Sequence, residues 1–136
     1  MSNHQDHVAP QLEDTWRAYL SYCNDRKLDR LSEFVHDTIR FNDEDVALAD
    51  YAAAIDSNLR VVPDFHWEVA DLLTSGDTVA VRLTDTGTPV GEWLGIAPTG
   101  RSFRIGEYAW YRFRDGKIAE MWFVLDAPLA ATQLAA

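Results

Sequence analysis

The chain has 136 residues, enough for one domain with one hydrophobic core, and carries 22 acidic against 12 basic residues, a net charge of −10. A surface this acidic repels phosphates and anionic lipids, so neither nucleic acid nor membrane is expected as a partner. The 47% hydrophobic and 25% charged residues are typical of a soluble globular protein. No apolar run reaches the ~20 residues that span a bilayer, and the start of the chain does not resemble a signal peptide, so we expect a cytoplasmic protein.

The first half of the chain is predicted to be mainly helical, within a single domain over 1–136 whose first seven residues, 1–7, are frayed. A helix is expected over 10–24, because apolar residues recur there at helical spacing: Leu12, Trp16, Tyr19, Leu20 and Cys23. Two further helices are predicted over 28–35 and 48–59, with a short strand at 39–41 between them. The last of these helices is Ala-rich and is ended by the residues around Pro63.

The second half is predicted to form antiparallel strands. Phe65, Trp67 and Val69 alternate with other residues in the pattern of a half-buried strand, a turn follows at 75–77, and the next strand starts near Val79. Two more strands are expected, over 103–113 and 117–125.

The connections between these strands carry their own signals. Asp115-Gly116 joins the last two strands and is the strongest short signal for a hairpin. The loop over 87–100 contains the apolar insert 93–96, whose Trp93 we interpret as a lid or a subunit contact rather than a core residue. Helices followed by hairpins predict an α+β fold, a cone-shaped barrel in which a curved antiparallel sheet packs on N-terminal helices around a pocket.

Metal binding and nucleophilic catalysis are both poorly supported. The four histidines show no paired spacing such as HExxH. The single cysteine, Cys23, excludes an internal disulfide and a Cys-based zinc cage, and its place on the apolar side of a helix predicts a buried, inert thiol. The chain has neither a Gly-x-Ser-x-Gly elbow nor a glycine-rich nucleotide motif, so no cofactor or metal is expected.

Acid/base chemistry in an aromatic pocket remains, and Asp126 is the leading candidate. Alternation along 117–126 places Trp122, Val124 and Asp126 on one face of the strand. A carboxylate beside a tryptophan would be partly desolvated, which raises its pKa toward the range useful for proton transfer. The pattern favours a second interpretation, in which Asp126 caps a helix that begins at Ala127-Pro128. The two roles are compatible.

Other candidates also have two interpretations each. His66 is either an exposed strand histidine or a donor to the substrate, Arg82 either faces solvent or pairs with a buried acid, and Glu107 is either a solvated edge charge or a pocket residue. The large aromatic residues are interpreted first as core and then as the lining of a pocket for a flat, apolar molecule: Trp67, Tyr108, Trp110 and Trp122.

The order of the motifs resembles a known family. The motifs are, in chain order, Pro63-Asp64-Phe65, the turn and strand GDTVAVR at 76–82, Thr86-Gly87-Thr88, Gly91, Gly95, Pro98-Thr99-Gly100 and YRFRDGKIAEMWFVLD at 111–126. Together they resemble the SnoaL-like polyketide cyclases, also called ester cyclases, of the nuclear transport factor 2-like superfamily. The resemblance covers nearly the whole chain. Many members have a histidine at the position of Pro89, so any role of that histidine is absent here.

The resemblance implies a cone-shaped α+β barrel without a cofactor, usually a homodimer or homotetramer. It implies a lyase- or isomerase-type enzyme that closes the last ring of an aromatic polyketide by intramolecular aldol condensation, with Asp126 as acid/base. His66, Arg82 or Tyr108 would then supply hydrogen-bond donors to the enolate. The alternative from a different class is a non-catalytic protein of the same fold that binds an apolar small molecule. An epoxide hydrolase ranks lowest, because Val124 stands where its acid is needed.

Overall fold

The computed structural model describes the backbone of residues 3–136 and the side chains of residues 11–136. Its elements, in chain order, are α1 (Asn3–Asn24), the 3-10 helix η1 (Leu28–Glu33), β1 (Val35–Phe41), β2 (Glu44–Ala47), α2 (Leu48–Val61), β3 (His66–Ser75), β4 (Thr78–Gly87), β5 (Phe103–Arg114), β6 (Lys117–Leu125) and α3 (Ala127–Leu134). The predicted α+β fold, with helices first and hairpins after, is confirmed.

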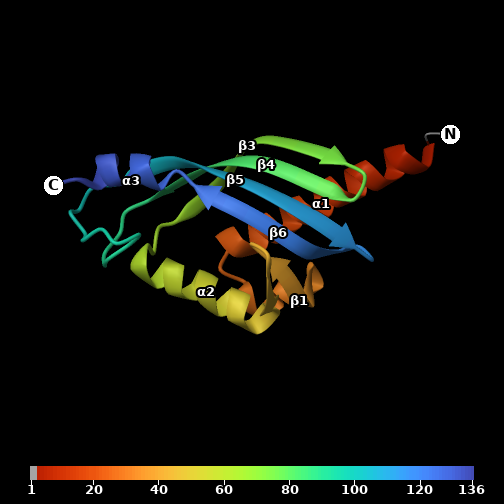
Figure 1. Ribbon diagram of the computed structural model, residues 1–136, viewed down its shortest axis with the longest axis horizontal. Coiled ribbons are helices and arrows are strands. Elements are labelled where there is room, and N and C mark those ends of the chain that lie inside the picture. The colour runs from red at the N-terminus through yellow and green to blue at the C-terminus, as the bar shows by residue number, and fades with distance from the viewer. Residues whose placement is uncertain (1–2) are drawn as a thin grey trace.

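The six strands form one curved, open sheet in the order β2-β1-β6-β5-β4-β3. Figure 1 shows the long strands β3 to β6 arching over α1 and α2. Register shifts in the β3–β4 ladder, between Val69 and Asp71, and in the β5–β6 ladder, between Arg112 and Phe113, mark irregularities of the kind that bend a strand. The curvature leaves a hollow inner side, which the two longer helices cover.

One pairing differs from the predicted antiparallel sheet, because β1 and β6 run parallel. The other neighbouring strands are antiparallel. Strands β2 to β5 and helix α2 separate β1 from β6 in the chain, so no hairpin turn fixes their relative direction. The sequence pattern therefore carried no information on this pairing.

The N-terminal helix begins earlier than predicted, at Asn3 instead of about residue 10. Of the residues expected to be frayed, 3–7 are helical in the structure and 1–2 lie outside the described residues. The apolar stripe begins only at Leu12 and therefore could not mark this start. Among the described residues, no helix is both long and apolar enough to cross a membrane.

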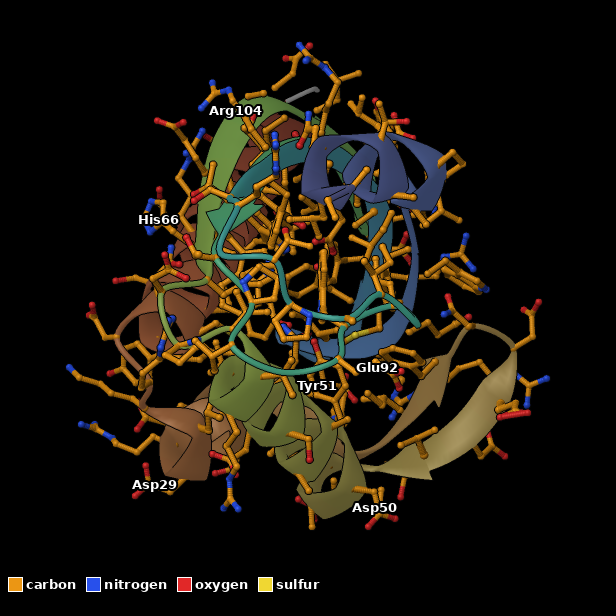
Figure 2. All side chains as sticks on the ribbon, turned by 90° about the vertical axis from the view of Figure 1, so that its left-hand side faces the viewer. Asp29, Asp50, Tyr51, His66, Glu92 and Arg104 are labelled. Carbon is orange, nitrogen blue, oxygen red and sulfur yellow. The ribbon has the colours of Figure 1, made fainter. Side chains whose placement is uncertain are left out.

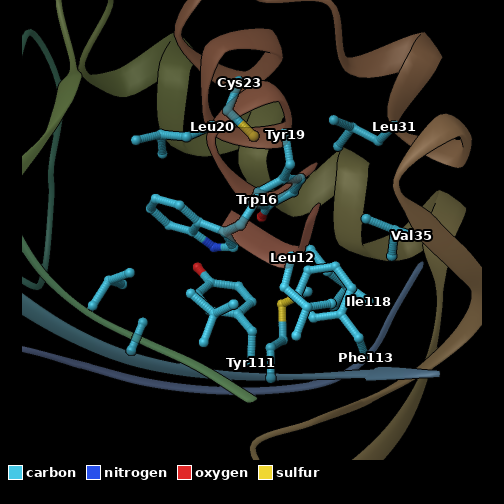
Figure 3. Packing of buried hydrophobic residues seen from close by; sticks show 14 of the residues in the cluster. Leu12, Trp16, Tyr19, Leu20, Cys23, Leu31, Val35, Tyr111, Phe113 and Ile118 are labelled. Atoms are coloured by element: carbon cyan, nitrogen blue, oxygen red, sulfur yellow. The ribbon is translucent and has the colours of Figure 1, made fainter. Parts of the chain in front are cut away.

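Buried side chains form two clusters. The larger lies between α1, η1 and the inner side of the sheet, where Trp16 is fully buried against Tyr111 (Figure 3). The smaller lies beneath α3 and the 88–102 segment and includes Phe65, Trp93 and Phe103. Figure 2 looks along the long axis and shows strands, helices and the 88–102 segment surrounding one interior.

Candidate active site

A cavity of about 300 Å³ lies between the inner side of the sheet and helices α1 and α2. Its wall is mainly aromatic and aliphatic, which is typical of a site for an apolar small molecule. The few polar side chains in the wall come from three elements: Tyr19 and Cys23 of α1, Tyr51 and Asn58 of α2, and Glu107 and Tyr111 of β5. These groups define the chemistry that the cavity can perform.

Glu107 lies in the cavity wall because it occupies an inward position of a central strand. On β5 the buried positions alternate, and Glu107 stands between Ile105 and Ala109 in that series with 8% of its surface exposed. Since β5 runs between β4 and β6, its middle residues are far from any sheet edge. The interpretation of Glu107 as a solvated edge charge is therefore wrong, and the pocket interpretation agrees with its position.

Asp85 lies beside Glu107 on the same inner face. In the β4–β5 ladder Leu83 pairs with Glu107 and Asp85 pairs with Ile105, so the two acids are diagonal neighbours. Asp85 is fully buried, and neither carboxyl oxygen accepts a hydrogen bond from the described part of the chain. An isolated buried carboxylate would be very costly, so the surroundings of Asp85 favour its protonated form over the ionised one.

The two acids perturb each other. Burial raises the pKa of Asp85 far above its ordinary value, and the neighbouring Glu107 adds to the rise. Burial also raises the pKa of Glu107, while the neighbouring side chains of Asp85 and Trp67 partly offset that rise. A carboxyl pair of this kind can hold one proton between them, so Glu107 can act as a base or, once protonated, as an acid.

Three phenols lie in the same cavity. The hydroxyls of Tyr19 and Tyr51 are hydrogen-bonded to each other, and the ring of Tyr111 packs edge-on against Tyr19 at 6.0 Å between centroids. Burial is the main cause that raises the pKa of all three, and the negative charge of Glu107 adds to the rise for Tyr51 and Tyr111. The three hydroxyls therefore stay neutral and can donate hydrogen bonds.

Cys23 is buried in the cavity wall, 3% exposed, as predicted. Burial raises the pKa of its thiol to about 12, and the neighbouring Tyr19 hydroxyl partly offsets that rise. The predicted burial of Cys23 is confirmed; a thiol that stays protonated is a poor nucleophile, which agrees with the prediction that it is inert. Among the described residues no group of three His, Cys, Asp or Glu side chains could hold a metal ion.

The apolar insert at 93–96 forms one side of the cavity. Trp93 and Ile96 exchange two backbone hydrogen bonds of 3.0 and 2.9 Å, and both Leu94 and Gly95 between them have positive φ. This is a two-residue hairpin turn of the primed type. Trp93 is 5% exposed and stacks on Phe103 at 4.2 Å, so the expectation that it lies outside the core is wrong. Both Trp93 and Leu94 line the cavity.

Asp126 caps α3, as one of its two interpretations predicted. Its carboxyl oxygen accepts a hydrogen bond of 3.2 Å from the backbone N–H of Leu129, and Pro128 lies in the first turn of the helix. The preceding residue, Leu125, lines the cavity, whereas Asp126 does not. The helix cap is confirmed, and the acid/base role of Asp126 stays a prediction.

The predicted aromatic residues divide between the two faces of the sheet. Trp67 lines the cavity, but Tyr108 and Trp110 are 49% and 47% exposed on the opposite, outer face. Trp122 is cross-strand from Trp110, and its indole N–H donates to Asp43 at 2.8 Å. The interpretation of Tyr108, Trp110 and Trp122 as core residues is therefore wrong, whereas Trp67 packs against the core. Alternation showed which residues share a face but not which face is inward.

His66 and Arg82 are also outside the cavity. Both are exposed; His66 begins β3 and points away from the interior (Figure 2), and Arg82 stands opposite Asp71 on β3 and Tyr108 on β5. The solvent-facing interpretation of Arg82 is thus confirmed. Of the predicted site residues, the structure brings Arg82, Tyr108, Trp110 and Trp122 together on the outer face, and places Glu107 and Trp67 in the cavity wall.

Sequence reasoning missed Asp85 and the phenols of the two helices. Asp85 continues an alternation of buried residues, Val79, Val81 and Leu83, so its inward position was readable from the strand pattern. Tyr19 was recognised as part of the helical stripe but only as a core residue. Nothing in the sequence around Tyr51 indicates that its hydroxyl meets that of Tyr19.

Comparison with known proteins gives consistent results. A family model described as SnoaL-like polyketide cyclase matches residues 13–134. A SnoaL-like polyketide cyclase of Agrobacterium tumefaciens is 29% identical, with a TM-score of 0.86 over 91% of this chain and 98% of that one. IdmH of Streptomyces antibioticus, provisionally described as a polyketide cyclase, is 26% identical, with a TM-score of 0.82 over 93% of this chain and 99% of that one. TsrD of Streptomyces laurentii is 26% identical, with a TM-score of 0.84 over 93% of this chain and 96% of that one. No curated protein matches the chain.

Proposed function

Because the chain belongs to the SnoaL-like polyketide cyclase family, we propose that it catalyses acid/base chemistry on an apolar, enolisable ketone inside the cavity. The reaction type is an aldol ring closure or a related lyase or isomerase reaction. One observation carries the proposal: Glu107 is a buried carboxyl in the wall of an apolar cavity, beside a second buried carboxyl, Asp85. This assigns to Glu107 the acid/base role that the family resemblance had given to Asp126.

The steps follow from the protonation states. The Glu107 carboxylate takes a proton from the carbon next to a ketone, and the electrons of that C–H bond form an enolate. The enolate carbon then bonds to a second carbonyl carbon of the same molecule, and the resulting alkoxide takes the proton back from Glu107. The raised pKa of Glu107 brings it closer to the pKa of the groups with which it exchanges protons. The reaction written in this way needs no cofactor.

The cavity also limits the substrate. A volume of about 300 Å³ lies at the lower end of ordinary ligand pockets, which favours a molecule of two or three fused rings. Flat rings fit between the aromatic side chains of the wall, such as Trp67, Phe41 and Phe123. An apolar wall also excludes water, so an enolate formed there is protected from protonation by solvent.

The test uses 2-tetralone, a bicyclic ketone with acidic hydrogens next to its carbonyl. In D₂O we expect the protein to accelerate the exchange of these hydrogens for deuterium, followed by NMR. Glu107→Gln removes the base with almost no change in shape, and should lower the exchange rate by roughly 100-fold or more.

Asp126→Asn is the matched variant, because it tests the acid/base role that the family resemblance gives to Asp126. We expect it to keep exchange near the wild-type rate, with a small loss of helix stability. If Asp126→Asn abolishes exchange while Glu107→Gln retains it, the assignment of Glu107 is overturned. If 2-tetralone binds but the wild-type protein exchanges nothing, the non-catalytic binding function replaces the enzymatic one.

The outer face of the sheet supports a proposal for the partner, a second copy of this chain. Leu73, Tyr108, Trp110 and Val124 are large apolar residues exposed on this one face, with Trp122 beside them. Charges of both signs flank them: Arg82 stands opposite Asp71, and Arg112 lies 3.6 Å from Glu120. In a chain with a net charge of −10, an apolar face with balanced charges is where two copies repel each other least.

A further inference from the structure

The polar groups of the cavity come from two sides. Glu107 comes from the sheet, whereas the hydrogen-bonded hydroxyls of Tyr19 and Tyr51 come from helices α1 and α2, which cover the sheet. Tyr111 rises from the sheet toward α1, with its hydroxyl directed to the indole of Trp16 (Figure 3). A molecule in the cavity is therefore bounded by a carboxyl and by a cluster of phenols, with apolar side chains forming most of the remaining wall.

The hydroxyl pair has one hydrogen-bond donor to spare. Two phenols carry two O–H groups, and the bond between Tyr19 and Tyr51 uses one of them. The second O–H belongs to a residue of the cavity wall, where most neighbours are apolar and the thiol of Cys23, next to Tyr19, is only a weak acceptor. Leaving a donor unpaired in such surroundings is unfavourable, so the arrangement is suited to a ligand that brings an acceptor oxygen.

The phenols remain donors under all ordinary conditions. Burial holds the pKa of Tyr19, Tyr51 and Tyr111 above the usual value for tyrosine, so none of them ionises near neutral pH. A neutral hydroxyl that is itself hydrogen-bonded by another is a stronger donor than an isolated one, because the two bonds polarise each other. Such a pair stabilises negative charge on an oxygen better than it stabilises a neutral carbonyl.

We propose that the hydroxyl pair of Tyr19 and Tyr51 is the oxyanion-binding element of this site, and that it fixes the ketone oxygen of the substrate on the side away from Glu107. The assignment rests on the proposed function for the reaction it serves, but the binding of a ketone oxygen is testable without any turnover. It also determines selectivity: a ligand of the same shape that lacks the oxygen leaves the spare hydroxyl unpaired.

The experiment measures the infrared C=O stretching band of 2-tetralone, labelled with ¹³C at the carbonyl, bound to the protein. In wild-type protein we expect the band below its position in an apolar solvent, because hydrogen bonding weakens the C=O bond. Tyr51→Phe and Tyr19→Phe should move the band back toward the apolar-solvent position and lower the deuterium exchange rate by roughly 10- to 100-fold. Tyr22→Phe is the matched control, since Tyr22 lies on α1 but packs on Phe34 and is not part of the cavity wall.

Binding of tetralin, the hydrocarbon without the oxygen, gives the second readout. Wild-type protein should bind 2-tetralone roughly tenfold more tightly than tetralin, and the advantage should disappear in the Tyr19→Phe/Tyr51→Phe double variant, which has no O–H left in the pair. Glu107→Gln should lose deuterium exchange but keep the shifted band, so a failure of the proposed function is distinguishable from a failure of this inference. An unshifted band in wild-type protein, a shift that survives both tyrosine variants, or equal binding of the two molecules overturns it.

Discussion

Asp85 lies diagonally across the β4–β5 ladder from Glu107, fully buried, with no hydrogen-bond donor from the described residues at either carboxyl oxygen. A sheet interior ordinarily excludes such a group, because an ionised carboxyl without partners is very costly there. The protonated form can remain, with Glu107 as the natural acceptor of its proton. The protein therefore keeps a destabilising residue next to Glu107, whose carboxyl lies in the cavity wall.

The cost of burying Asp85 predicts how stability depends on pH. The pKa of Asp85 is raised in the folded protein, so above about pH 4 the unfolded chain releases a proton that the folded chain keeps. Folding then loses stability as pH rises, by up to about 1.4 kcal/mol per pH unit. Asp85→Asn removes the ionisable carboxyl and with it this loss of stability. The free energy of unfolding of the variant should therefore rise relative to that of wild type between about pH 4 and pH 8. Urea unfolding at several pH values measures it.

The test depends on how the difference in the free energy of unfolding between Asp85→Asn and wild type changes with pH, and not on the size of that difference at one pH. A new amide can pack better or worse than a carboxyl, but that difference does not depend on pH. An Asp85→Asn curve that runs parallel to the wild-type curve from pH 4 to pH 8 would show that Asp85 ionises normally in the folded protein.

The same contact predicts a shift in the pH profile of exchange. The neighbouring side chain of Asp85 lowers the pKa of Glu107 against the effect of burial, as a carboxyl O–H that can donate toward Glu107 would. Asp85→Leu removes the donor, so the pKa of Glu107 should rise and deuterium exchange of 2-tetralone should need a higher pH. Asp85→Asn keeps a donor at this position and should leave the profile closer to wild type. Identical profiles for the two variants would show that Asp85 does not act on Glu107.

Much of the fold was readable from local patterns. Period-two alternation and the Asp115-Gly116 signal predicted the β5–β6 hairpin, and both turn residues have the positive φ that this turn requires. Strand β2 was missed because the four residues from Glu44 to Ala47 are too few and too polar for a periodic signal. The parallel β1–β6 pairing joins distant segments, so no local pattern can report it.

The site was less predictable because both faces of β5 carry aromatic residues. Tyr108 and Trp110 point outward, while Tyr111 and Phe113 point inward, so aromatic content cannot tell the pocket from the outer surface. Burial of Glu107 depends on the strands at both sides of β5, which pair with it only in the folded protein. Local sequence supplied the cap role of Asp126, but not the assembly of the cavity.

The outer face gives a prediction on assembly. Trp110→Glu places a charge in the middle of the exposed apolar residues, and in a homodimer through this face it brings two like charges together. We expect the wild-type protein to be a dimer or tetramer and the variant to fall to a smaller species in analytical ultracentrifugation. Leu129→Glu on α3 adds the same charge at another exposed apolar residue and should keep the wild-type state. A monomeric wild-type protein would contradict the prediction.

A side chain at Gly87, at the end of β4, is predicted to destabilise the fold. A Cβ atom at this position would lie 2.4 Å from Val62 Cγ1 and 3.0 Å from Phe103 Cζ, both buried core side chains. Gly87→Ala should therefore lower the free energy of unfolding by roughly 1–3 kcal/mol, measured by chemical denaturation. Gly91→Ala is the control, because its Cβ would have its nearest neighbour at 3.8 Å. Equal effects of the two substitutions would show that the chain relaxes around Gly87 without cost.

The last prediction concerns the hydrogen bond that ties the 93–96 hairpin to α2. Trp93 Nε1 donates to Asn58 Oδ1 at 2.8 Å, and both residues line the cavity. Trp93→Phe keeps an aromatic ring to stack on Phe103 but loses the donor, whereas Asn58→Leu leaves a buried indole N–H unpaired and should cost about 1–3 kcal/mol. In the double variant that unpaired donor no longer exists. The double variant should therefore lose less stability than the sum of the losses in the two single variants. Strict additivity in chemical denaturation would mean that the hydrogen bond between Trp93 and Asn58 does not stabilise the fold.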